Sequence, residues 1–245
     1  MTERLLQVLD AEAEVAAMVS RVGSDLSRRR FEGDVCGFTH MALALREHGE
    51  WWIHHLLNTA AGPHGHLYRQ PPLDFFRDDP FEYRACVLVP SPPLQQRIAT
   101  VLLSSVRERL HTPRYSCVSY PFSTKYQSSN QWVLEIVGAA QGGGSDRHAV
   151  QSYLAAAGFR PSVLRTAGIV GQVLYALTAR NAHFDDHPLR NRLHGRLEFV
   201  LRSSLRHFLQ LTDAPIERMF RLGAPAGAPG TSGELAWRAP AAATP

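Results

Sequence analysis

Histidines stand at two places in the first third of the chain where the residue pattern is typical of β-strands. His40 lies in the run FTHMALAL, and His54 and His55 lie together in WWIHHLL. Successive side chains of a strand point to opposite faces, so only one of the adjacent histidines can share a face with His40. Two imidazoles on one face would suit a general base with an orienting partner. The alternative is that these are ordinary polar residues of a half-exposed hairpin.

A serine stands at the predicted start of a helix, in the segment YQSSNQWVLEIV at residues 126–137. Ser128 and Gln131 have the spacing of a capping box, in which the hydroxyl binds the N3 amide and the glutamine reaches back. The free amides and positive dipole end of a helix N-terminus would also stabilise an anionic nucleophile or an oxyanion at Ser129. Ser129 is therefore the candidate nucleophile, and Gln131 and Trp132 are candidate binding residues.

The segment NAHFDDHP gathers acidic and imidazole groups within five positions, at His183, Asp185, Asp186 and His187. Such a cluster could bind a divalent cation. A turn before Pro188, in which an aspartate side chain binds nearby backbone amides, explains the same residues without a metal. We expect no metal here, and we treat Asp185, Asp186 and His187 as candidate binding residues.

The three cysteines, Cys36, Cys86 and Cys117, are widely spaced and include no CxxC pair. This spacing does not indicate a zinc site, a redox centre or a disulfide framework. Cys117 is a possible displaced nucleophile, although a small buried residue is the commoner role of an isolated cysteine. The glycine run at 142–144 follows a predicted helix and so does not resemble a phosphate-binding loop. No cofactor is expected.

The composition of the 245 residues, 44% hydrophobic and 20% charged, is that of an ordinary globular protein. The net charge is +4 and the arginines are scattered, so no nucleic-acid partner is expected. No apolar run is long enough to span a membrane. Residues 1–222 are expected to form one domain with an N-terminal helix. Residues 223–245, dominated by Ala, Pro, Gly and Thr, are expected to be a disordered tail.

The order of the predicted elements indicates the α+β class, an antiparallel sheet with helices packed beside it. Two extended runs, 38–45 and 51–57, are joined by a polar turn with Gly49, which predicts a β-hairpin. Residues 58–72, rich in Gly, Pro and His, are expected to form a loop. Further strands are expected at 85–90, 162–165 and 196–201, and helices at 5–18, 73–77, 92–112, 131–140, 146–157, 169–179 and 204–211.

Two resemblances follow from these motifs. FTHMALALREHGEWWIHHLL, followed later by SSNQWVLEIV, resembles the circularly permuted branch of the NlpC-like papain-fold superfamily, which includes the lecithin:retinol acyltransferase relatives. In that branch a catalytic His opens one strand, a second polar residue lies on the next, and a nucleophilic Cys begins a later helix. The segments RVGSDLS, HLLN, PFSTKYQSSNQWVLE and NAHFDDHP, within residues 15–212, are similar to a bacterial family known only by a domain-of-unknown-function label.

The resemblance implies a permuted papain-like fold with His40 as catalytic base, His55 rather than His54 as orienter, and Ser129 at the nucleophile position. The superfamily has Cys where this chain has Ser129, and a serine hydroxyl is a far weaker acid than a thiol. Two functions therefore stay open. One is a hydrolase or acyltransferase acting on an amide or ester, and the other is an inactive module that binds a peptide, a cell-wall fragment or a lipid.

The first twenty residues carry acidic groups and helical apolar spacing, unlike a signal peptide, which predicts a cytoplasmic protein. The resembled family is commonly exported, so a periplasmic or secreted location is the alternative. The expected partner is a small-molecule, peptide or lipid-like substrate.

Overall fold

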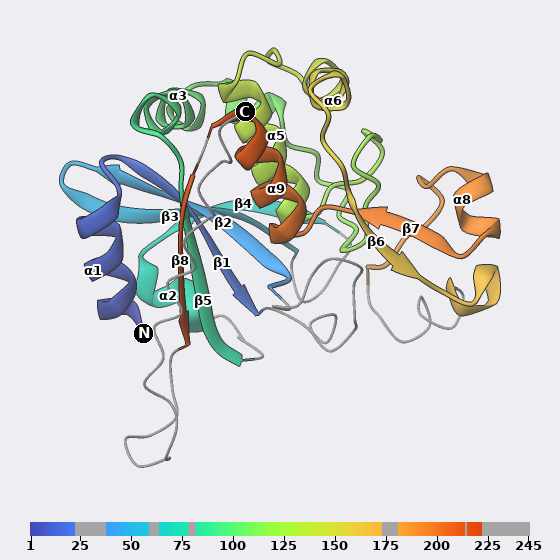
Figure 1. Ribbon diagram of the computed structural model, residues 1–245, viewed down its shortest axis with the longest axis horizontal. Helices are drawn as coiled ribbons and strands as arrows, with labels where there is room; N and C mark the ends of the chain where they lie inside the picture. Colours follow the sequence, from blue (N-terminus) through green and yellow to red (C-terminus); the bar gives the residue numbers. More distant parts are fainter. Residues whose placement is uncertain (23–37, 59–63, 78–81, 173–180, 214, 222–245) are drawn as a thin grey trace, which may run out of the picture.

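The computed structural model describes residues 1–22, 38–58, 64–77, 82–172, 181–213 and 215–221. Its largest feature is a six-stranded antiparallel sheet with the strand order β4-β3-β2-β1-β5-β8 (Figure 1). The strands are β1 Ala16–Val22, β2 His40–Glu47, β3 Glu50–Asn58, β4 Gly65–Gln70, β5 Glu82–Val89 and β8 Ile216–Arg221. The α+β class expected from the sequence is confirmed.

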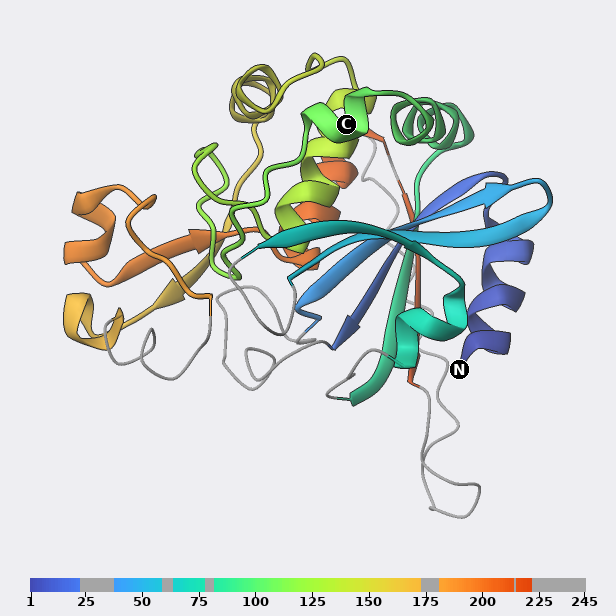
Figure 2. The same ribbon diagram turned by 180° about the vertical axis from the view of Figure 1, so that it is seen from behind.

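Helices lie on both sides of this sheet, as Figures 1 and 2 show. One face carries α1 Thr2–Glu12 and α2 Pro72–Arg77, and the other carries α3 Pro92–Leu103, α5 Ser129–Ala140 and α9 Arg202–Thr212. The short α4, Val106–Arg109, follows α3, and α6, Arg147–Ala156, packs on α5. To one side lies an antiparallel ribbon of β6 Ser162–Arg165 and β7 Arg196–Phe199, with α8 Leu189–Leu193.

The alternation of side chains along β2 divides the core in two. Met41 and Leu43 pack in the cluster that contains Trp132 of α5. Ala42 and Ala44 pack in a second cluster, with the apolar side chains of α1 and α2. Odd-numbered residues of β2 therefore face α5, and even-numbered residues face α1 and α2.

The hairpin predicted from the sequence is confirmed as β2 and β3. Leu43 pairs with His54, and Glu47 pairs with Glu50 across a two-residue turn. Both turn residues have positive φ, 52° at His48 and 88° at Gly49. Such a turn matches the twist of the flanking strands, which explains why a glycine stands there.

The expected opening helix at 5–18 is wrong in its second half, because α1 ends at Glu12 and β1 begins at Ala16. Every residue of β1 is buried, since the strand lies in the middle of the sheet. A strand buried on both faces lacks the alternation that would identify it, and a short apolar run next to a helix then looks like its continuation.

Two further expectations are corrected. The loop expected at 58–72 contains β4, an edge strand with mixed burial that pairs with β3. The single helix expected at 92–112 is interrupted after Leu103, and the chain resumes as the short α4. The helices predicted at 131–140 and 146–157 correspond to α5 and α6.

Some expectations fall on residues that the structure does not describe. The tail at 223–245 lies outside the described residues, as does most of the helix expected at 169–179. Within the described ranges, none of the helices has the length and apolar character needed to cross a membrane.

Candidate functional site

His40 and His55 form a buried pair on the face of the sheet that α1 and α2 cover. The His40 Nε2 atom lies 3.0 Å from His55 Nδ1, so one imidazole donates a hydrogen bond to the other. His54, the next residue along β3, points to the opposite face, where its Nε2 lies 2.9 Å from Glu47 Oε1. The structure therefore brings His40 and His55 together and separates His54 from them.

The histidine pair is enclosed by an aromatic ring and a cation. The Phe75 ring lies 5.8 Å from the His40 ring and 5.3 Å from the His55 ring, measured between centroids. The Arg21 guanidinium lies over the same Phe75 ring at 4.8 Å and donates to the Phe75 carbonyl. Burial lowers the pKa of His40 well below 6.5, and the charges of Arg21 and His55 lower it further. His40 is therefore a neutral imidazole at pH 7.

The N-terminus of α5 is capped by Ser128, whose Oγ accepts a hydrogen bond of 3.2 Å from the Gln131 amide. This half of the predicted capping box is confirmed. The other half is wrong, because the Gln131 side chain does not reach back to the cap. It donates instead to Glu135 and to three backbone carbonyls of the preceding loop, at Tyr120, Pro121 and Ser123.

Replacing Ser128 by alanine is expected to lower the free energy of unfolding by about 1 kcal/mol, because the Gln131 amide loses its capping acceptor. Chemical denaturation measures this difference. Ser152→Ala is the matched control, since Ser152 bonds only within the exposed side of α6, to the His148 carbonyl. We expect the control to change stability by less than about 0.5 kcal/mol. Equal losses for the two variants would contradict the capping role.

Ser129 begins the first turn of α5, and its hydroxyl is engaged within the protein. The hydroxyl lies 3.5 Å from Asn130 Oδ1, and its interaction with the phenol of Tyr115 lowers the pKa of that phenol. Burial raises the pKa of Tyr115, so this phenol is neutral. Ser129, His40 and His55 all belong to the described part of the chain, and no hydrogen bond joins the serine to either histidine. The nucleophile and base expected from the sequence are not hydrogen-bonded to each other.

Asn130 fixes the position of this helix end against the sheet. Its Oδ1 accepts from the Met41 amide at 2.8 Å, and its Nδ2 donates to the carbonyls of Thr39 at 3.1 Å and Val200 at 2.9 Å. The start of β2 and the start of α5 are therefore neighbours. The His40 side chain nevertheless lies on the sheet face opposite α5, because Met41 is the residue of this pair that faces the helix.

The NAHFDDHP segment packs on the loop that precedes α5. Asp186 Oδ2 accepts from the Tyr120 amide at 2.8 Å, and His187 Nε2 lies 2.7 Å from the Val118 carbonyl. Asp185 forms an ion pair with Lys125. Burial raises the pKa of Asp186 to about 6. Asp185, Asp186 and His187 thus hold the preceding loop in place. This corresponds to the alternative in which these side chains bind nearby backbone groups without a metal.

Cys117 lies in the same loop, half-buried, and its backbone amide donates to the Asn181 carbonyl at 3.0 Å. Its neighbours include the apolar clusters on both sides of the loop. Cys36 lies outside the described residues. Within the parts of the chain that the structure describes, no three His, Cys, Asp or Glu side chains are placed to hold a metal ion.

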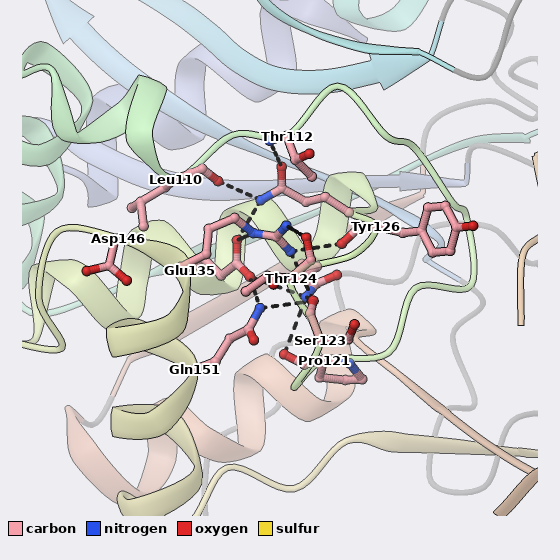
Figure 3. A network of polar contacts seen from close by, with 12 residues as sticks. Leu110, Thr112, Pro121, Ser123, Thr124, Tyr126, Glu135, Asp146 and Gln151 are labelled. Carbon is pink, nitrogen blue, oxygen red and sulfur yellow. Dashed lines mark hydrogen bonds and ion pairs between the residues drawn. The ribbon is translucent and has the colours of Figure 1, made fainter. Parts of the chain in front are cut away.

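The buried carboxylate of Glu135, which was not predicted from the sequence, connects the elements that surround the start of α5. Glu135 of α5 is fully buried and accepts hydrogen bonds from Arg147, at 2.9 Å, and from three glutamine side chains, Gln127, Gln131 and Gln151 (Figure 3). Arg147 also donates to loop carbonyls at Thr124 and Tyr126. The network ties α5, α6 and the loop at 110–127 together. The available sequence signal was a lone acidic residue inside the apolar run WVLEIV.

A small pocket opens on the α5 face of the sheet, away from the histidine pair. It has a volume of about 60 Å³ and is lined by Trp132 of α5, His54 of β3, Arg107 of α4, and Leu67, Tyr68 and Arg69 of β4. Trp132, a candidate binding residue, therefore lines a pocket, whereas Gln131 of the same turn is committed to the loop. The pocket was not predicted, because three of its residues lie in a segment expected to be a loop.

Comparisons with known proteins give one family and one distant structure. No curated protein matches the chain. Among solved structures, the chain is similar to the metalloprotein yiiX from Escherichia coli O157:H7, described as DUF1105, with 10% sequence identity and a TM-score of 0.45. That match covers 80% of this chain and 92% of the other. The family described as an uncharacterized protein conserved in bacteria, DUF2145, matches residues 8–209. Since this match spans most of the chain, the protein belongs to the DUF2145 family.

Proposed function

We propose that this protein is a catalytically inactive module of the permuted papain-like type that binds its ligand without covalent chemistry. The observation that carries the proposal is the engagement of the Ser129 hydroxyl with Asn130 and Tyr115 rather than with a histidine. A serine attacks a carbonyl only when a base within hydrogen-bond reach takes its proton. Ser129 has no such base among the described residues.

The electrostatics of His40 support the same proposal. A general base works best when its pKa lies near the working pH, and burial together with the Arg21 charge pushes the pKa of His40 well below that range. The positive charge of Arg21 also opposes the imidazolium that proton transfer to His40 would create. The histidine pair is better suited to a structural role, with each ring hydrogen-bonded to the other and packed on Phe75.

The permuted papain-like relationship rests on the order of the motifs. His40 opens one strand, His55 lies on the next strand of the hairpin, and Ser129 begins a later helix. The ligand classes that suit an inactive member of this architecture are a peptide, a cell-wall fragment or a lipid. Nucleic acid does not suit the scattered arginines of this chain.

A hydrolase or acyltransferase acting on an amide or ester is the second candidate, and one observation favours it. The 3.0 Å contact between His40 Nε2 and His55 Nδ1 is the geometry in which a second residue orients a catalytic imidazole. In this alternative Ser129 is the nucleophile, His40 the base and His55 the orienter. Ser129 would have to leave Tyr115 and approach His40.

A fluorophosphonate probe separates the two candidates, because it labels serines that a neighbouring base activates. We expect no labelling of Ser129 in the wild-type protein, measured by intact mass and peptide mapping, beside an active serine hydrolase as positive control. His40→Ala is the matched variant. Labelling at Ser129 that disappears in His40→Ala would overturn the binding-module proposal and establish the hydrolase candidate.

The Ser129→Cys variant tests the same site from the chemical side. We expect its thiol to react slowly with iodoacetamide, with a rate that is still rising above pH 8.5, because burial raises the pKa of a thiol above that of free cysteine, about 8.5. Cys117 is the internal reference, quantified in the same digest. A rate at position 129 that is already maximal near neutral pH, and many times that of Cys117, would mean that the site ionises thiols and is poised for catalysis.

A further inference from the structure

The pocket beside Trp132 combines a cavity with a buried donor that has no partner. Trp132 is fully buried, and its indole Nε1 makes no hydrogen bond to any residue that the structure describes. A buried N–H without a partner is costly, so indole nitrogens in protein interiors normally reach a hydrogen-bond acceptor. Trp132 also lines a cavity of about 60 Å³, and although its Nε1 has almost no accessible surface in this arrangement, a small rotation of the ring would bring Nε1 to an acceptor supplied from outside the chain.

The pocket is positively charged at its rim. Arg69 is held in place, because it donates to both oxygens of Glu47, at 3.0 Å and 3.3 Å, and lies 3.5 Å over the Trp52 ring. Arg107 donates a hydrogen bond of 2.6 Å to Glu108, which belongs to the same short helix. The Glu108 side chain is 56% exposed, and exposed ion pairs contribute little. An incoming anion can therefore replace Glu108 as the partner of Arg107.

The field of these arginines reaches the interior of the pocket. The charges of Arg107 and Arg69 lower the pKa of His54, which burial lowers already, while its hydrogen bond to Glu47 acts in the opposite direction. His54 is therefore a neutral member of the wall. The remaining wall is formed by the apolar side chain of Leu67 and by Tyr68, whose ring lies on the other face of the sheet, 5.9 Å from the His55 ring.

We propose that this pocket binds the carboxylate of a small organic acid or of a ligand that ends in one, with Trp132 Nε1 as the deep donor and Arg107 at the mouth. The volume suits a group of roughly three or four heavy atoms, since a cavity of this size holds more than one water. One carboxylate oxygen meets the indole N–H and the other meets the guanidinium. Leu67 accommodates an adjoining alkyl carbon. A phosphate, with more oxygens to satisfy, has too few donors here.

This site goes beyond the proposed function, because it does not depend on whether Ser129 is inert. It lies on the sheet face opposite the histidine pair. The fluorophosphonate and thiol experiments can therefore fail or succeed without deciding this proposal.

Titration of the full chain with sodium acetate and sodium propionate tests the proposal, with the Trp132 indole N–H followed by NMR. The signal is assigned by its loss in Trp132→Phe, and sodium chloride at equal ionic strength is the reference. We expect a saturable shift of this signal, with a Kd on the order of millimolar for so small a ligand. Arg107→Gln is expected to raise the Kd by about tenfold or more.

Arg109→Gln is the matched control, because Arg109 lies on the same helix and loses the same charge without lining the pocket. Its Kd for acetate is expected to equal that of the wild type. If Trp132→Phe does not fold, the two arginine variants still decide the question through the Kd read from whichever indole signal shifts saturably with acetate. A shift no larger than with chloride would mean that the cavity holds water only. An equal loss in Arg109→Gln, or saturation by inorganic phosphate but not by acetate, would likewise overturn the carboxylate site.

Discussion

Replacing Glu135 by alanine is expected to lower the free energy of unfolding by about 3 to 5 kcal/mol, the range measured when one partner of a buried ion pair is removed. The carboxylate is fully buried and accepts four side-chain donors, one of them the Arg147 guanidinium. Its loss leaves that cation and several amide N–H groups without their acceptor in a dry interior. Urea unfolding followed by circular dichroism measures the change as a shift of the midpoint.

Glu108→Ala is the matched control for this prediction. Glu108 also pairs with an arginine, Arg107, but its side chain is 56% exposed. We expect a loss of less than about 1 kcal/mol for this pair. A loss at Glu135 no larger than the loss at Glu108 would contradict the description of Glu135 as the buried centre of the network. Because Glu135 and Arg147 interact directly, the double variant Glu135→Ala/Arg147→Ala is expected to lose less stability than the sum of the losses in the two single variants.

The Glu135 network matters for the candidate site because it sets the path of the loop that ends at Ser128. Gln131 and Arg147 hold carbonyls of this loop at Ser123 and Thr124 (Figure 3). The same loop receives the anchors of the NAHFDDHP segment, including the bond from the Tyr120 amide to Asp186. The loop that leads to Ser129 is therefore held both by the Glu135 network and by the NAHFDDHP segment. These contacts oppose the movement of Ser129 toward His40 that the hydrolase alternative requires.

The parts of the fold that could be predicted are those whose signals are local. The β2–β3 hairpin follows from two alternating runs and a turn with a glycine at positive φ. The start of α5 follows from Ser128, whose hydroxyl caps the helix as its sequence position indicates. Both depend on interactions between residues a few positions apart.

The parts that could not be predicted depend on distant partners. The β1 strand was hidden because both of its faces are buried, by helices that come from different parts of the chain. The edge strand β4 carries no continuous apolar face and exists through its pairing with β3. Glu135 is an acidic residue whose partners Gln127, Arg147 and Gln151 have no shared motif.

In the candidate site, too, the pairing of the histidines follows from local sequence, whereas the surroundings of Ser129 depend on distant packing. Strand alternation limits the partner of His40 to one of two adjacent histidines, and the observed pair is His40 with His55. The sequence could not indicate on which face of the sheet α5 packs. That choice puts Met41 rather than His40 toward the helix and leaves Ser129 with Tyr115 and Asn130 as partners.

Stability is expected to fall as the pH is lowered from about 7.5 to about 5.5, by about 2 to 4 kcal/mol. Burial lowers the folded-state pKa of His40 well below 6.5, and it also lowers the pKa values of His54, His111 and His187. Below pH 6.5 the unfolded chain therefore binds protons that the folded protein does not. The stability these groups contribute is fully present above pH 6.5 and is lost as the pH falls. Each group that binds a proton in the unfolded chain but not in the folded protein lowers the free energy of unfolding by about 1.4 kcal/mol for each pH unit below 6.5.

Asp186 acts in the opposite sense over part of this window. Its folded-state pKa is raised to about 6 by burial, so below pH 6 the folded protein keeps a proton that the unfolded chain releases. This offsets the histidine effect by less than about 1 kcal/mol at pH 5.5. His40→Gln removes one titrating group, and we expect it to reduce the stability lost between the two pH values by about 1.4 kcal/mol. Ser152→Ala, a change of an exposed side chain of α6 that does not titrate, should leave that loss unchanged. If His40→Gln also leaves it unchanged, His40 is not the buried neutral imidazole on which the binding-module proposal relies.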